Sequence, residues 1–91
     1  MDPDRLDARL AREFDASDAE RRIVVRQACD LADSGKPEAD RGSELTIDDL
    51  VRHLTDAPAG STLVDRWNWW LGALEIAYGG YDAFCVRVVN G

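Results

Sequence analysis

The segment DRWNWWLGALEIAYGGYDAFCVRV, residues 65–88, contains all three tryptophans of the 91-residue chain and its clearest structural signals. A helix wound at about 100° per residue over 62–78 has one broad apolar sector. The residues in that sector are Leu63, Val64, Trp67, Trp70, Leu71, Leu74, Ala77 and Tyr78. A hydrophobic core explains Trp67 and Trp70, and Gly79 with Gly80 predicts the end of this helix.

Trp69 lies outside this sector, on the opposite side of the same helix. It shares a second apolar face with Ile76, and two small residues, Gly72 and Ala73, lie between them. A helix that is apolar on two faces is either buried all round or covered by a partner. The N-terminal helix or the C-terminal strand of the same chain is one candidate cover. A second copy of the chain, related by a two-fold axis, is the other.

Three more helices are predicted upstream, each opened by a side chain that caps its first turn. The predicted spans are 2–14, 17–34 and 46–56, opened by Asp2, Ser17 and Thr46. Ser17 and Glu20 form a capping box, in which each side chain accepts the other's backbone N–H. This cap outweighs the strand propensity of the run 23–25.

The remaining segments are predicted as a loop and a strand. Residues 35–45 are polar and contain one proline and two glycines, which predicts a loop. Phe84, Val86 and Val88 alternate with their neighbours at the two-residue period of a β-strand. A lone strand is unstable, so its partner is expected to be either 43–46 or the same strand of a second copy.

Together these elements predict a single domain over residues 1–91 with a mainly α fold. In detail this is a small α+β arrangement of about four helices and one short C-terminal β-strand. No apolar run reaches the roughly 18–20 residues of a membrane span, and the charged N-terminus does not match a signal peptide. Cys29 and Cys85 form no metal-like pair, so we expect free thiols in a reducing cytoplasm.

The charge composition is unusual. Eighteen acidic and eleven basic residues give a net charge of −7, thirteen of the acids are Asp, and Lys36 is the only lysine. This composition resembles that of proteins from halophilic archaea, whose salt-filled cytoplasm screens charge to within about 3 Å at 1 M salt. An acidic protein from a GC-rich genome is the alternative. Outside a halophile, such a charge argues directly against nucleic-acid binding.

The sequence contains no combination of nucleophile and base that predicts catalysis. Asp49, His53 and Asp56 lie on one side of a predicted helix, but Asp–His pairs at this spacing are common on surfaces. Glu75 borders the apolar sector and is expected to pair with an arginine or with solvent. We therefore predict no enzyme activity, no catalytic residue, no metal site and no cofactor.

The first functional hypothesis is a small protein-interaction module. It would form a homodimer, or bind another protein, through the face made of Trp69, Gly72, Ala73 and Ile76. Neither role needs a membrane or a nucleic acid.

The second hypothesis rests on a resemblance. Residues 44–89, with a capped helix, a short turn, a second helix and then a strand, resemble a winged helix-turn-helix. In that family the second helix enters the major groove of DNA. The resemblance implies that Asp65, Arg66 and Trp69 would contact bases. Arg66 is the sole base of that helix, and the wing lacks a second strand.

Overall fold

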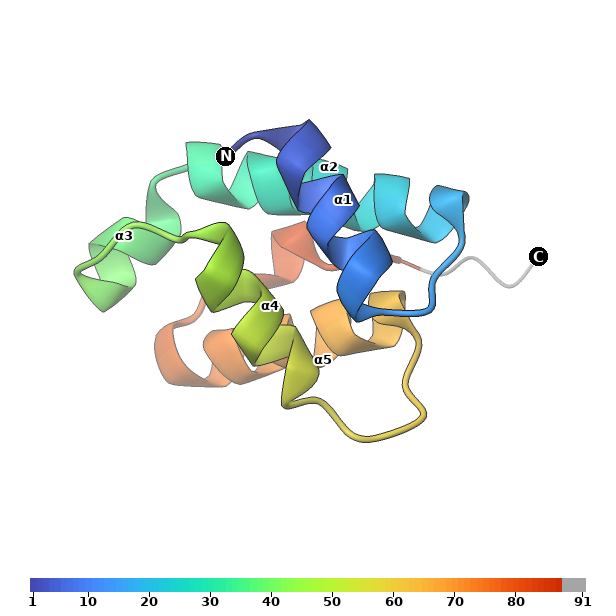
Figure 1. The fold of residues 1–91 in the computed structure, drawn as a ribbon. Helices are drawn as coiled ribbons and strands as arrows, with labels where there is room; N and C mark the ends of the chain where they lie inside the picture. The colour runs from blue at the N-terminus through green and yellow to red at the C-terminus, as the bar shows by residue number, and fades with distance from the viewer. Residues whose placement is uncertain (88–91) are drawn as a thin grey trace.

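The computed structural model describes residues 1–87, which form five α-helices and one 3₁₀-helix (Figure 1). In chain order these are α1 (Pro3–Glu13), α2 (Asp18–Asp33), α3 (Lys36–Arg41), α4 (Ile47–Thr55), α5 (Leu63–Tyr78) and the 3₁₀-helix η1 (Asp82–Phe84). The prediction of a mainly helical fold is confirmed. No helix in this part of the chain has both the length and the apolar character needed to cross a membrane.

The helices pack in two layers whose facing sides are the predicted apolar stripes. In Figure 1, α1 and α4 lie in front of α2 and α5. Helix α1 packs on α2 and α4, and α5 packs on the same two helices from the other side. The core between them contains Leu6, Leu10, Val24, Ala28, Leu31, Leu50, Val51, Leu54, Leu63, Trp67, Trp70, Leu71 and Leu74. Because α5 contributes the most buried side chains, it is the central element of the fold.

Side-chain caps open four of the helices, as predicted. Each cap accepts a hydrogen bond from a backbone N–H two or three residues further on, and the caps are Asp2, Ser17, Thr46 and Thr62. The reciprocal half of the predicted capping box is wrong. The Glu20 carboxylate instead accepts a hydrogen bond from the backbone N–H of Leu63 at 3.2 Å. Glu20 thereby joins the beginning of α2 to the beginning of α5.

The predicted loop over 35–45 is wrong in its centre, where α3 forms. Gly35 has a φ of 73°, a left-handed conformation that ends α2 and turns the chain. Pro37 then lies in the first turn of α3, where its missing N–H costs no hydrogen bond, and its ring is buried. The proline that prevents α2 from continuing therefore also begins the next helix.

The predicted C-terminal strand is wrong for residues 84–87, and Val88 and Val89 lie outside the described residues. Phe84 ends η1, and the backbone from Cys85 is extended but joins no β-ladder within residues 1–87. Nor do residues 43–46 serve as its partner, because Leu45 is buried in the core. Val86 instead bonds to the side chain of a helix residue.

The buried stripe of α5 is shorter than predicted. Ala77 and Tyr78 are exposed, with 49% of Tyr78 accessible to solvent. The chain reverses at Gly79 and Gly80, which have positive φ angles of 78° and 84°. After this reversal Tyr81 returns to the core and is fully buried. Tyr81, which follows the turn, is thus the tyrosine in the core, in place of Tyr78.

Candidate functional site

The four residues Trp67-Asn68-Trp69-Trp70 in the first half of α5 form the candidate site. Consecutive helix residues point about 100° apart, so four of them cover every side of the helix. Two of these side chains are buried, one is partly buried and one is exposed. The four side chains therefore make different contacts.

Trp67 combines a core position with a polar contact. Its side chain is fully buried and meets Trp70 edge to face, with the ring centroids 5.6 Å apart. Its indole N–H donates a hydrogen bond of 2.9 Å to the backbone carbonyl of Phe84. A buried indole N–H needs such a partner. The core tryptophan therefore also holds the segment that follows η1.

Asn68 holds the same segment through both groups of its amide. Its Nδ2 donates to the Val86 carbonyl at 2.8 Å, and its Oδ1 accepts from the Val86 N–H at 2.8 Å. One residue that exchanges both main-chain groups with its partner is the pattern of a hydrogen-bonded pair in an antiparallel sheet. The Asn68 side chain thus takes the place of a neighbouring strand.

Trp70 lies against α4. It is 3% exposed and stacks on His53, with ring centroids 5.2 Å apart and planes 14° from parallel. Burial, followed by the nearby charges of Arg41 and Arg52, lowers the pKa of His53 below its ordinary value of 6.5. Neutral His53 is therefore the form that the fold stabilises.

Two of the three possible metal ligands, Asp49 and His53, are engaged in other contacts, and the third, Asp56, is exposed. Asp49 pairs with Arg52 at 2.9 Å and with Arg41 at 3.5 Å, while His53 stacks on Trp70. Within residues 1–87, no three His, Cys, Asp or Glu side chains gather as a metal site would require.

We expect acid to destabilise the fold through His53. The unfolded chain binds a proton near pH 6.5, whereas the folded chain binds it only at lower pH. Stability is therefore fully present above this pH and falls as the pH drops from about 7.5 to about 5.5. Urea unfolding at both pH values should show a larger loss for the wild type than for His53→Gln. Equal losses in the two proteins would contradict this assignment.

The face that contains Trp69 is open to solvent. Trp69 is 43% exposed and Ile76 is 90% exposed, and Ala73 between them is also exposed. A methyl group added at Gly72 would meet no atom within 4 Å. Among residues 1–87, neither the N-terminal helix nor the segment after η1 buries this face. The sequence left two candidates to cover this face, another segment of the same chain and a second copy. Within residues 1–87, no other segment of the chain covers it.

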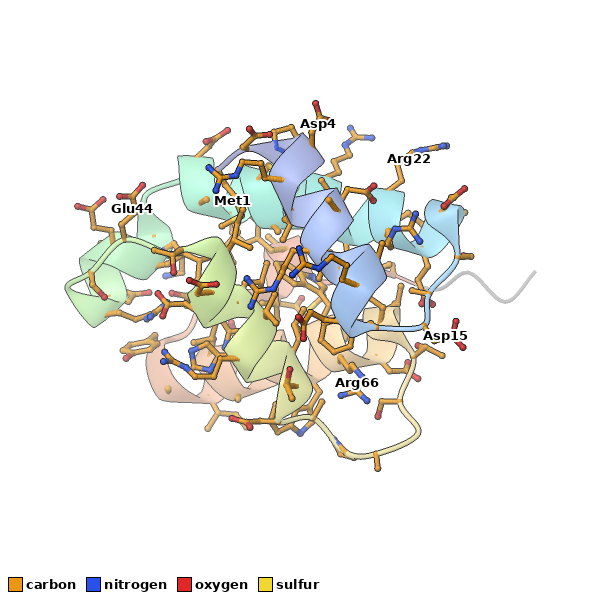
Figure 2. All side chains as sticks on the ribbon, viewed as in Figure 1. Met1, Asp4, Asp15, Arg22, Glu44 and Arg66 are labelled. Carbon is orange, nitrogen blue, oxygen red and sulfur yellow. The ribbon has the colours of Figure 1, made fainter. Side chains whose placement is uncertain are left out.

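Of the three residues proposed to contact bases, two are exposed and the third makes contacts within the fold. Asp65 and Trp69 are exposed, but Arg66 donates to the carbonyls of Leu54 and Ser61 at 3.0 and 3.3 Å. Its guanidinium also lies over the ring of Phe14, 5.3 Å from the centroid, beside the C-terminal end of α1 (Figure 2). A cation at the last carbonyls of α4 is a favourable helix-end contact. Arg66 is therefore engaged within the fold.

Sequence reasoning missed a polar cluster around the only lysine. Lys36 pairs with Asp40 at 3.1 Å and lies over the Tyr81 ring, 4.8 Å from its centroid. The Tyr81 hydroxyl donates to Asp40 at 2.9 Å. The hydrogen bonds from Lys36 and then Tyr81 lower the pKa of Asp40, and burial raises that of Tyr81. The sequence feature that could have indicated this cluster is that Lys36 is the only lysine among eleven basic residues.

Glu75 also has a structural role that the sequence did not predict. Its carboxylate accepts hydrogen bonds from the backbone N–H groups of Tyr81 and Asp82, at 2.6 and 3.2 Å. It therefore fixes the reversal after α5 in place of the expected arginine contact, while the residue stays exposed, as the solvent alternative predicted.

A family model described as the WNWW domain matches residues 1–75, and the four letters of that description are residues 67–70 of this chain. The chain matches no curated protein and no solved structure at a significant level.

Proposed function

The chain belongs to the WNWW domain family, and we propose that it is a small non-enzymatic module that self-associates as a homodimer through the face of Trp69, Gly72, Ala73 and Ile76. The observation that supports this proposal is the exposure of Trp69 and Ile76 on either side of an open Gly72. Tryptophan is enriched at the centres of protein interfaces, where a large rigid ring contributes much of the binding energy.

The spacing of this face suits a two-fold axis. If two copies of α5 cross in antiparallel orientation between Gly72 and Ala73, Trp69 of each copy faces Ile76 of the other. This is the self-complementary contact of an isologous dimer. The small residues at the crossing point allow the two helix axes to approach closely. Space above Gly72 supports this arrangement, because no side chain of residues 1–87 fills it.

The proposed dimer is weak and depends on salt. A face of four residues is at the small end of protein interfaces, so we expect a dissociation constant in about the micromolar range. Each copy has a net charge of −7, which opposes association where the charges are unscreened. Association should therefore strengthen as the KCl concentration rises, as in the cytoplasm of a halophilic archaeon, where we propose that the protein acts.

The two thiols support the proposed reducing, cytoplasmic location. Cys29 and Cys85 are both free and partly buried, and burial raises the pKa of each. A raised pKa keeps a thiol protonated and unreactive.

We do not extend the proposal to DNA binding. The only base of α5, Arg66, is bonded to carbonyls of its own chain. The described residues also lack the strand with which a wing would begin.

The dimer is tested by sedimentation of the wild type and Trp69→Ala in about 2 M KCl. The wild type should sediment as a dimer and Trp69→Ala as a monomer, with unchanged helical circular dichroism. Ile76→Asp should also give a monomer, because it places a charge on the same face. Gly72→Leu should disrupt association as well, by filling the crossing point.

Ile23→Ala serves as the matched control. Ile23 is 44% exposed, as Trp69 is, but lies on α2, so its truncation should leave the dimer intact. A wild type that stays monomeric at every concentration in high salt would rule the proposal out.

A further inference from the structure

We propose that Trp67 and Asn68 form a recognition site for main-chain groups, which residues 84–86 of the same chain occupy and which also accepts a short segment of another protein. The site lies on the flank of α5, about 100° around the helix from Trp69. It is therefore separate from the proposed dimer face and does not depend on it.

The site recognises main-chain atoms alone. Its three hydrogen bonds go to the Phe84 carbonyl, the Val86 N–H and the Val86 carbonyl, at 2.9, 2.8 and 2.8 Å. Each of these groups is present in every three-residue segment without proline at the third position. Main-chain bonding of this kind gives affinity, while the side chains at alternate positions give specificity.

The receptor side of the site is rigid and already formed. Trp67 is fully buried and packs edge to face on Trp70, which fixes the direction of its indole N–H. Asn68 projects from the same helix turn, in the centre of a sixteen-residue helix. Binding of a ligand therefore costs these two side chains little conformational entropy.

The occupant is held much less firmly than the receptor. Beyond the turn of η1, the main chain of Cys85 and Val86 makes one hydrogen bond to the backbone, from Cys85 to Asp82 at 3.2 Å. The side chains of Phe84, Cys85 and Val86 are only partly buried against the core. The bonds to Trp67 and Asn68 are thus the main polar attachment of this segment within residues 1–87.

The extent of the family match is an independent observation. The family model covers residues 1–75, which include Trp67 and Asn68 but exclude the segment 84–86. The receptor therefore belongs to the part of the chain that defines the family, and its occupant does not.

The occupant shows the chemistry of a suitable ligand. Two apolar side chains, Phe84 and Val86, flank Cys85, whose backbone is extended, and a basic residue, Arg87, follows. A basic residue also suits a receptor with a net charge of −7. We therefore expect the partner segment to have an apolar, any, apolar, basic pattern.

The experiment weakens the chain's own occupant and measures binding of a free peptide. Val86→Pro removes the N–H that bonds to Asn68. Cys85 already has φ −68° and ψ 145°, which a following proline favours, so this change should not strain the backbone. The probe is a fluorescein-labelled peptide of residues 82–87 carrying Cys85→Ser, and fluorescence anisotropy reports its binding to the full chain.

The Val86→Pro chain should bind the peptide about tenfold more tightly than the wild type, the equivalent of one hydrogen bond. The double variant Asn68→Ala, Val86→Pro should lose this binding, because the receptor amide is gone. The dimer variant Trp69→Ala should bind the peptide as the wild type does, which separates this proposal from the dimer. Equal binding to Val86→Pro and to the double variant would overturn the proposal.

A second measurement applies if Val86→Pro does not fold. The same peptide is added in excess to the wild type, because a tethered segment competes at an effective concentration of about millimolar. The indole N–H resonance of Trp67 should shift, while that of Trp69 stays in place. An unchanged Trp67 resonance at saturating peptide would also overturn the proposal.

Discussion

Trp67→Ala is expected to unfold the chain, or nearly so, at every protein concentration. Truncation of a buried tryptophan leaves a large cavity and costs about 3–5 kcal/mol. A chain of 91 residues has roughly 5–14 kcal/mol of total stability. Trp67 is fully buried at the centre of α5 and also holds Phe84, so its loss removes packing and a hydrogen bond together. Thermal and urea unfolding followed by circular dichroism measure the effect.

Two variants serve as controls for this result. Trp67→Phe keeps an aromatic ring in the core but loses the N–H donor, so its cost should lie between those of the wild type and Trp67→Ala. Trp69→Ala removes a side chain that is 43% exposed, so the stability of its monomer should change little. If Trp69→Ala destabilised the monomer as strongly as Trp67→Ala, the assignment of Trp69 to an interface would be wrong.

The second large effect is expected from salt. Eighteen acidic against eleven basic residues produce repulsion that folding concentrates into a small volume. The ion pairs that offset it involve partly exposed side chains, such as Arg9 with Asp48, and contribute little each. The melting temperature should therefore be higher in about 2 M KCl than in about 0.2 M KCl, as the halophile hypothesis requires.

A variant with fewer acidic side chains tests whether charge repulsion causes the dependence of the melting temperature on salt. Several exposed acids form no ion pair within the described region, and Asp15, Asp30, Asp33 and Asp56 are four of them. Changing these four to Asn alters the net charge from −7 to −3 and should reduce the dependence of melting temperature on salt. A wild type that melts at the same temperature in both salt concentrations would refute the halophile hypothesis.

The helices could be predicted because their signals are local. A cap such as Thr62 and an apolar spacing such as Trp67, Trp70 and Leu74 act within one or two turns, and the structure contains both. The same periodicity correctly placed Trp67 in the core and assigned Trp69 to a second face of the helix, which the structure shows to be exposed. Short sequence patterns therefore predicted the helices and also the two faces of α5.

The errors came from contacts between residues far apart in sequence. The alternation at 84–88 predicted a strand, but Phe84 ends a 3₁₀-helix and Val86 bonds to the side chain of Asn68, eighteen residues earlier on a helix. Glu20 caps a helix that begins more than forty residues later. No pattern within a short window contains such information. The hydrogen bonds of Asn68 could therefore not be predicted, although the residue lies between two tryptophans.

The cluster around Lys36 affects how association of this protein can be detected. Reagents that couple primary amines have one side-chain target in the chain, and that amine is paired with Asp40 at 3.1 Å beneath the turn at Gly80. Acylation there would neutralise the charge that holds Asp40 and Tyr81 together. Amine-directed cross-linking would thus perturb α3 and the turn after α5. Carbodiimide activation of the abundant surface carboxylates, with an added dihydrazide that bridges two activated carboxylates, is the better choice for capturing a complex of this chain.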